Sequence, residues 1–229
     1  MNAFLYARSN SSRLPKKCFK KIYGSTTLIE HMIGRAKLAF DNENIYLLTS
    51  DSESDTDLRK TSKKHNIKLI TGSLNNVIDR TIKAIHESKS EFFSRINCDS
   101  PFFPYYSLRQ VIKYNKEFDM ISSITTNKRL YGVGIECIKS KFFLNSLKKS
   151  EFPINKENIF DHIYNDENLK SKINFCKISK PSKDINYKKV HFENKYTVDN
   201  YKDLENIREI FLEIEETKRL ETILIPLSY

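Results

Sequence analysis

The feature that most constrains the fold is an alternation of strand-like and helix-like segments over the first 125 residues. Short apolar runs typical of buried strands are separated by longer segments with amphipathic or polar helical patterns. Strands joined through helices pair in parallel, and a parallel sheet needs helices on both of its faces. The strands are expected at residues 3–6, 44–49, 67–71, 91–97 and 119–125. The pattern therefore predicts a mostly parallel α/β sheet.

The helices between these strands carry their own boundary signals. Thr27 and Glu30 match a capping box, which predicts that a helix starts there. Further helices are expected at residues 52–65, directly after Gly72–Ser73, at 105–116 and at 201–220, and further strands at 131–138 and 173–178. Because no internal repeat or long linker interrupts the chain, residues 1–229 are expected to form a single domain.

Composition limits the environment and the partners of the chain. Lys and Arg number 39 against 29 Asp and Glu, which gives a net charge of +10 and favours anionic partners. The lysines are scattered along the chain, and an AT-rich genome would also produce a lysine-rich composition. Because no nucleic-acid-binding motif is present either, neither nucleic acid nor membrane is expected as a partner. The four cysteines lack C-x-x-C spacing, and the N-terminus lacks signal-peptide features. A cytoplasmic protein without disulfides is expected.

A cation-rich loop follows the first expected strand, where open α/β sheets place their ligands. This loop, residues 7–17, carries Arg8, Arg13 and Lys17 together with Ser11 and Ser12. Arginine binds phosphate oxygens through a bidentate fork, and lysine binds them as a point charge. Hydroxyl and backbone N–H groups can line the same cradle. The loop therefore indicates an enzyme that handles a nucleoside triphosphate.

Two aspartates follow predicted strands and are candidate metal ligands. Asp99 stands before Ser100–Pro101, and Asp199 stands before the last expected helix. Each has a structural alternative, because Asp99 is also a common turn residue and Asp199 is also a good helix N-cap. Two oxygen ligands completed by substrate phosphate and water suit Mg²⁺ better than zinc.

These residues resemble a known family. The segment A-R-x-x-S-x-R-L-P-x-K at residues 7–17 resembles the opening motif of the cytidylyltransferases that activate acidic sugars as CMP conjugates, most of all the spore-coat-polysaccharide type, and with it the CMP-Kdo and CMP-sialate synthetases. Later motifs follow in the same order: G-x-x-x-x-V-I-D-R at 72–80, R-x-x-x-D-x-P at 95–101, G-x-E at 134–136, D-H at 161–162 and T-V-D at 197–199. The chain departs from the family at residues 9–12 and at Lys16, where the family often has glycine.

The resemblance implies roles for individual residues. Catalytic roles fall to Arg13, Lys17 and Asp99, Mg²⁺ binding to Asp99 and Asp199, nucleotide contacts to Ala7, Arg8, Ser11, Ser12, Gly72, Ser73, Arg80 and Asn97, and acceptor contacts to Glu136 and His162. Three of these have equally simple structural readings. Arg80 can pair with an acid on the helix surface, Glu136 can be a solvated strand residue, and His162 can be a core histidine.

The resemblance also implies a fold type and a reaction. The fold is expected to be a single-domain, mostly parallel, Rossmann-like sheet of the nucleotide-diphospho-sugar transferase type. Segment 131–179 would be a small dimerisation or acceptor-site arm of a homodimer. The reaction would join CMP from CTP to an anionic acceptor, with release of pyrophosphate, for surface polysaccharide or glycoconjugate synthesis. A Kdo-like acid, a sialic-type acid, a phosphonate and a polyol phosphate all remain open as acceptors.

Two other functions stay open at this point. A glycosyltransferase of similar fold would use a D-x-D metal motif, and that spacing occurs at Asp55–Asp57 inside a polar helix. A catalytically inactive homologue could instead use the positive charge to bind an anionic ligand, and steep salt dependence of nucleic-acid binding would favour it.

Overall fold

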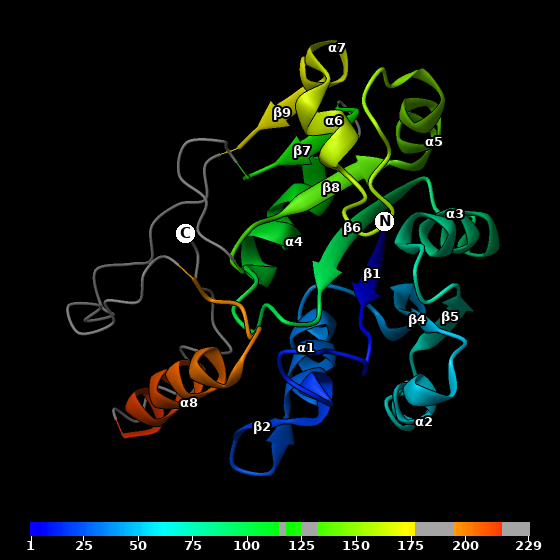
Figure 1. Ribbon diagram of the computed structural model, residues 1–229. Coiled ribbons are helices and arrows are strands. Elements are labelled where there is room, and N and C mark those ends of the chain that lie inside the picture. Colours follow the sequence, from blue (N-terminus) through cyan, green and yellow to red (C-terminus); the bar gives the residue numbers. More distant parts are fainter. Residues whose placement is uncertain (115–117, 125–131, 177–194, 217–229) are drawn as a thin grey trace.

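A seven-stranded sheet forms the centre of the protein (Figure 1). The computed structural model describes residues 1–114, 118–124, 132–176 and 195–216. The strands follow the order β5-β4-β1-β6-β8-β7-β9, and of these only β8 runs antiparallel to its neighbours. Their bounds are β1 Asn2–Tyr6, β4 Ile45–Ser50, β5 Lys68–Gly72, β6 Phe92–Asn97, β7 Met120–Ser122, β8 Glu136–Lys139 and β9 Ile173–Phe175. The predicted mostly parallel α/β sheet is confirmed.

Helices cover both faces of this sheet because alternate strand residues point to opposite sides. Leu5 of β1 belongs to a core cluster shared with helices α1 (Leu28–Lys37), α2 (Thr56–Lys64), α4 (Tyr105–Tyr114) and α8 (Tyr201–Glu216). Its neighbour Phe4 belongs to a second cluster, shared with α3 (Val77–Ser88), α5 (Ser140–Lys149), α6 (Asp161–Asn165) and α7 (Glu167–Lys170). The arrangement is a three-layer sandwich with one core on each side of the sheet.

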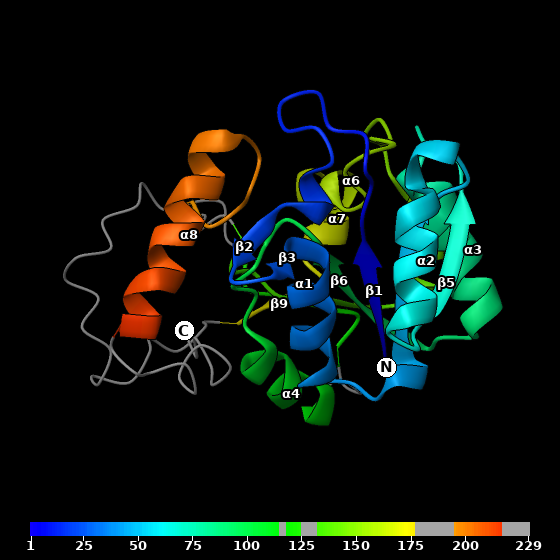
Figure 2. The ribbon, with the colours of Figure 1, turned by 90° about the horizontal axis from the view of Figure 1, so that it is seen from below.

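Smaller elements fix the N-terminal region against the last helix. The capping box predicted at Thr27 is present, since Thr27 accepts from the Glu30 N–H and Glu30 accepts from the Thr27 N–H. A short hairpin of β2 (Lys21–Tyr23) and β3 (Thr26–Thr27) precedes α1 and packs beside α8 (Figure 2). This hairpin directly follows the cation-rich loop, so α8 and the loop are held in the same region.

The register of the central strands sets the edge at which the loops emerge. Tyr6 of β1 pairs with Leu48 of β4 and with Asn97 of β6. The chain segments that follow β1 and β6 therefore leave the sheet side by side. Ligands of open α/β sheets bind outside this carboxyl edge.

Several predicted elements differ in extent from those in the structure, and two of them show a structural cause. The helix expected at 52–65 begins as a 3-10 turn (Glu53–Asp55) and becomes α2 only at Thr56, because the Asp55 carboxylate bonds back to strand β4. The strand expected at 131–138 is shorter: β8 starts at Glu136, after a turn in which Gly132 has φ +92°. A Cβ at Gly132 would lie 2.5 Å from the Tyr196 carbonyl oxygen, so this close passage requires glycine.

The segment predicted as an arm contributes directly to the sheet. Its described part, residues 132–176, supplies β8 and β9 together with α5, α6 and α7. Its dimerisation role stays a prediction. The polar loop at 180–189, the end of the strand at 177–178 and the helix end at 217–220 lie outside the described residues. Within the described part of the chain, no helix has the length and apolar character needed to cross a membrane.

Candidate functional site

A pocket of about 310 Å³ opens at the carboxyl edge of β1 and β6. Five cationic and three acidic side chains line it, which gives an excess of positive charge. Of the predicted residues, those that line the pocket are Ala7, Arg8, Ser11, Ser12, Arg13, Lys17, Arg80, Asn97, Asp99 and Asp199. The pocket thus gathers residues from both ends of the described chain.

The opening loop owes its shape to a buried anchor and one left-handed residue. Leu14 is fully buried, and its N–H donates to the Ser11 hydroxyl at 3.3 Å. Lys16 has φ +53°, a conformation that favours glycine, and a 3-10 turn (Lys17–Phe19) follows it. This left-handed backbone conformation explains why the family that the chain resembles often has glycine at the position of Lys16.

The two predicted metal ligands converge because the backbone segments that carry them are hydrogen-bonded to each other. The Val198 N–H donates to the Asp99 carbonyl oxygen at 2.8 Å. Asn200, and not Asp199, caps α8, since the Asp203 N–H donates to Asn200 Oδ1 at 3.0 Å. The alternative reading of Asp199 as the N-cap is therefore wrong, and its carboxylate is available to the pocket.

One ammonium group lies between the two carboxylates. Lys17 Nζ is 3.0 Å from Asp99 Oδ2 and 3.6 Å from Asp199 Oδ1. Burial by itself would lower the pKa of Lys17, but the charge of Asp99 and the hydrogen bond to it raise the pKa above its ordinary value. Burial likewise would raise the pKa of Asp199, and the charge of Lys17 lowers it. The Asp199 carboxylate and the Lys17 ammonium group therefore carry their charges at neutral pH.

The remaining loop cations also face carboxylates. Arg13 Nη2 is 3.4 Å from Asp199 Oδ1, and Arg8 Nη1 is 3.2 Å from Glu157 Oε1. Both arginine side chains are largely exposed, so these pairs are weak and easily exchanged for a ligand. The loop thus presents cations whose present partners an anionic ligand can replace.

Arg80 forms the buried wall of the pocket. Its residue is 3% exposed, and neither Nε nor Nη1 has a hydrogen-bond partner among the described residues. Burial lowers the pKa of Arg80 from its ordinary value. A buried guanidinium with unused donors is costly unless an anion meets it. The alternative, in which Arg80 pairs with Asp79 or Glu87 on the helix surface, is wrong because the Arg80 side chain is buried.

Gly72 and Ser73 do not line the pocket, and their contact with the nucleotide stays a prediction. The expected helix begins later, at Val77, with the Asn76 side chain accepting from the Asp79 N–H as N-cap. Gly72 instead ends β5, and a Cβ there would lie 2.9 Å from Arg80 Cγ. Gly72 therefore leaves room for the Arg80 side chain.

A second, smaller cavity of about 70 Å³ adjoins the first, and both are lined by Arg95 and Asn97. Arg95 donates to Asn97 Oδ1 at 3.2 Å and to Glu136 Oε2 at 3.2 Å, and Glu136 also accepts from the Tyr164 hydroxyl. Glu136 is 5% exposed and lines only this smaller cavity, so the reading as a solvated strand residue is wrong. Arg95 thus lies between the two cavities.

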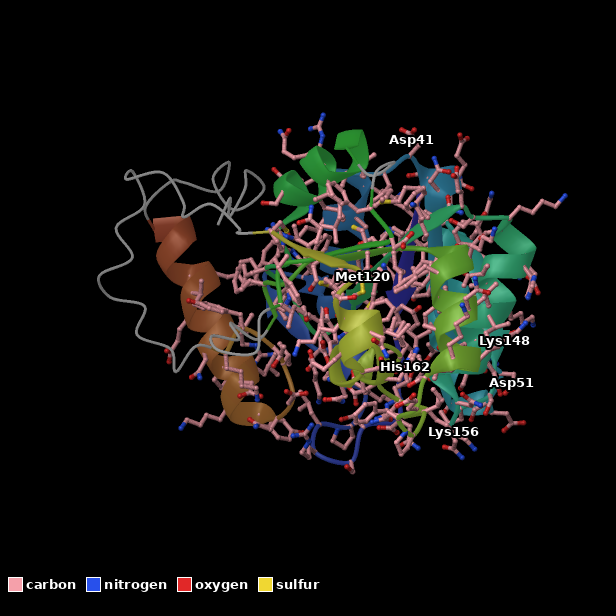
Figure 3. All side chains as sticks on the ribbon, turned by 90° about the horizontal axis from the view of Figure 1, so that it is seen from above. Asp41, Asp51, Met120, Lys148, Lys156 and His162 are labelled. Atoms are coloured by element: carbon pink, nitrogen blue, oxygen red, sulfur yellow. The ribbon has the colours of Figure 1, made fainter. Side chains whose placement is uncertain are left out.

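His162 lies in the core and not at either cavity (Figure 3). It is 1% exposed on α6, and its Nε2 lies 2.8 Å from the Ser146 hydroxyl of α5. Burial lowers the pKa of His162, which keeps the ring neutral. The predicted acceptor contact is therefore corrected, and the alternative reading as a core histidine describes its position.

The D-x-D spacing at Asp55–Asp57 does not form a metal site in the structure. Asp55 is fully buried and accepts hydrogen bonds from Ser9, Thr49 and Ser50, whereas Asp57 is exposed on α2 beside Lys60. Neither lines the pocket. Because one carboxylate is buried and the other is exposed, they do not form the D-x-D metal motif that a glycosyltransferase of this fold would use.

Sequence reasoning missed three residues that shape the pocket. Arg95 stands two positions before Asn97, so the strand period of two places both side chains on one face, and this signal was readable. Lys195 pairs with Asp199 Oδ2 at 3.2 Å. Glu157 reaches Arg8 from the loop between α5 and α6, and nothing in the sequence pattern indicates that contact.

A family model described as "Cytidylyltransferase" matches residues 3–222. The spore coat polysaccharide biosynthesis protein SpsF of Bacillus subtilis (strain 168) is 34% identical over 109 residues, which cover 44% of this chain and 45% of that protein. The matched segment therefore spans less than half of that relative.

Solved structures show the same fold at low sequence identity. A cytidylyltransferase from Leptospira borgpetersenii superposes with a TM-score of 0.78 at 21% identity, covering 97% of this chain and 95% of that one. A CMP:2-keto-3-deoxy-manno-octonic acid synthetase complexed with CTP gives a TM-score of 0.64 at 14% identity, covering 93% of this chain and 98% of that one. Both likenesses extend over nearly the whole chain.

Proposed function

Since the chain belongs to the cytidylyltransferase family and is a nucleotidyltransferase enzyme, we propose that its pocket binds CTP and transfers CMP to an anionic sugar-type acceptor. Pyrophosphate is the second product. The observation that carries this proposal is the pocket itself, where Arg8, Arg13, Lys17 and buried Arg80 surround one space beside two carboxylates. A triphosphate supplies the several anionic oxygens that such a set of donors can bind.

The carboxylates fit a divalent cation. Asp99 and Asp199 already share the ammonium group of Lys17, which occupies the kind of bridging position that a cation takes between two carboxylates. The described residues contain no group of three or more His, Cys, Asp or Glu side chains able to hold a metal. Two protein carboxylates completed by phosphate and water are typical of Mg²⁺ sites. When bound, Mg²⁺ supplies charge stabilisation at the α-phosphate.

Individual residues of the protein have separate roles in the transfer. An oxygen of the acceptor attacks the α-phosphorus, and the bond from that phosphorus to the oxygen bridging the α- and β-phosphates breaks. Arg8, Arg13 and Lys17 hold the triphosphate and balance the charge that develops on the departing pyrophosphate. Lys17 is the best placed, because its side chain is 14% exposed and lies beside both carboxylates.

The acceptor is proposed to approach from the smaller cavity. Glu136 fixes one edge of the Arg95 guanidinium, and Asn97 and Asn158 fix the others. These three bonds use three of the five N–H donors of arginine, so donors remain for an anionic acceptor. A role in surface polysaccharide or glycoconjugate synthesis is supported by the spore-coat name of the Bacillus relative.

A homodimer through segment 131–179 is part of the same proposal. Three large apolar side chains of its described part are exposed, namely Phe152, Ile154 and Phe175. Exposed apolar groups of this kind often mark contacts between subunits.

Nucleotide binding tests the proposal without knowledge of the acceptor. Thermal unfolding is measured with CTP, UTP, GTP or ATP, each with and without Mg²⁺. We expect CTP with Mg²⁺ to stabilise most, by about 2.7 kcal/mol at a concentration 100 times its dissociation constant. Equal responses to all four nucleotides would contradict the CTP assignment. No response, together with steeply salt-dependent binding of nucleic acid, would favour the inactive anion-binding homologue.

A further inference from the structure

Asp55 is a buried carboxylate that ties the opening loop to strand β4. It is 0% exposed, and its Oδ1 accepts from the Ser9 N–H at 2.7 Å. Its Oδ2 accepts from the Thr49 hydroxyl at 2.9 Å and from the N–H and hydroxyl of Ser50 at 3.0 and 2.5 Å. Burial would raise the pKa of Asp55, but these hydrogen bonds lower it, so the group stays ionised.

The bond to Ser9 replaces a bond of the parallel ladder. The Ala7 N–H still donates to the Leu48 carbonyl of β4 at 3.1 Å. Donors of a parallel strand recur at every second residue, so the Ser9 N–H would next meet the Ser50 carbonyl. That carbonyl accepts from Arg59 Nη1 instead, and the Ser9 N–H turns to Asp55. The loop therefore leaves the sheet at the residue that Asp55 holds.

From this contact we propose that Asp55 is a positioning residue for nucleotidyl transfer, which fixes the opening loop so that Arg8, Ser11 and Ser12 face the triphosphate. The inference rests on the proposed function of the pocket. Asp55 does not itself line the pocket, so it acts through Ser9 and the neighbouring Arg8. A carboxylate suits this place because every group facing its two oxygens is a donor.

Asp55→Asn tests the anchor selectively. Three donors face Oδ2 and one faces Oδ1, so the amide oxygen will take the Oδ2 position. The NH₂ group will then lie opposite the Ser9 N–H, and two donors cannot form a hydrogen bond. Thr49→Val is the matched control, because it removes one buried hydrogen bond to Asp55 and leaves the Ser9 contact intact. A role limited to stability would make the two variants alike.

The first readout is CTP affinity, measured by calorimetry well below the unfolding temperature of each variant. We expect Asp55→Asn to weaken CTP binding about 10-fold or more, as for loss of a contact with a charged group, and Thr49→Val to change it about twofold at most. The effect of Asp55→Asn should shrink in an Arg8→Met background, because contacts that act as a unit are not additive. Asp55→Asn with wild-type affinity, or with the affinity of Thr49→Val, overturns the proposal.

The second readout does not depend on a ligand. Hydrogen exchange at residues 8–13 should be faster in Asp55→Asn than in Thr49→Val, and equal exchange overturns the anchor. If the wild-type protein does not bind CTP, both the proposed function and the positioning role of Asp55 are contradicted. This holds even if hydrogen exchange shows that Asp55 holds the loop. Should Asp55→Asn fail to fold, Ser9→Pro removes the N–H donor from the loop side, and unchanged CTP affinity in that variant overturns the proposal.

Discussion

Replacing Asp99 with Asn is expected to lower turnover about 100-fold or more while the fold stays intact, as for loss of one major electrostatic contact. The carboxylate pairs with Lys17 and, with Asp199, is the proposed Mg²⁺ site. The amide removes the negative charge that a divalent cation needs but keeps the size of the side chain. Turnover is measured as pyrophosphate release at saturating CTP and Mg²⁺, and folding is followed by thermal unfolding.

Asp119→Asn supplies the matched control for this experiment. Asp119 is also paired with a lysine, Lys139, but it does not line the pocket. We expect its turnover to stay within about twofold of wild type, because exposed ion pairs contribute little. An Asp99→Asn variant with wild-type turnover would remove Asp99 from the metal site.

Arg80→Met is expected to separate stability from binding. We predict that CTP affinity falls about 10- to 100-fold, the loss typical of a hydrogen bond to a charged group. The free energy of unfolding of the protein without nucleotide should stay unchanged or rise, because Met replaces a buried cation whose Nε and Nη1 lack partners among the described residues. Calorimetry with CTP and denaturant unfolding without it measure the two quantities.

The opposite pattern would assign Arg80 to the core. A variant that unfolds more easily but binds CTP as wild type does would mean that the guanidinium serves packing alone. Arg109→Met is the control, since Arg109 is an exposed arginine on α4. We expect it to leave both CTP affinity and stability nearly unchanged.

The sheet could be predicted because its signals are local. Strands β1, β4 and β6 are buried on both faces, so they appear in sequence as short apolar runs such as Ile45–Ser50. The capping box at Thr27 marked the start of α1 for the same reason, since both partners lie within one turn. Element ends were less accurate where long-range contacts decide them, as at Gly132, where the chain turns beside Tyr196 and β8 begins only at Glu136.

The site could be predicted only where a residue follows a strand or carries the family motif. Asp99 and the loop cations satisfied both conditions, and they line the pocket. Arg80 was also predicted from its motif, but its burial, like the roles of Gly72 and Asp55, depends on contacts between elements. Gly72 leaves room for the Arg80 side chain, and the Asp55 carboxylate accepts a hydrogen bond from the Ser9 N–H. Neither role produces a periodic pattern in the sequence. His162 was misassigned because a motif position says nothing about burial.

The central claim is the transfer of CMP from CTP, and pyrophosphate release measures it most directly. CTP, UTP, GTP and ATP are each incubated with Mg²⁺ and with Kdo, sialic-type acids, simple phosphonates or polyol phosphates. We predict release with CTP and one class of anionic acceptor, its loss on chelation of the metal, and its return with added Mg²⁺. Preferred release from another nucleotide, or release that persists without a divalent cation, would contradict the claim.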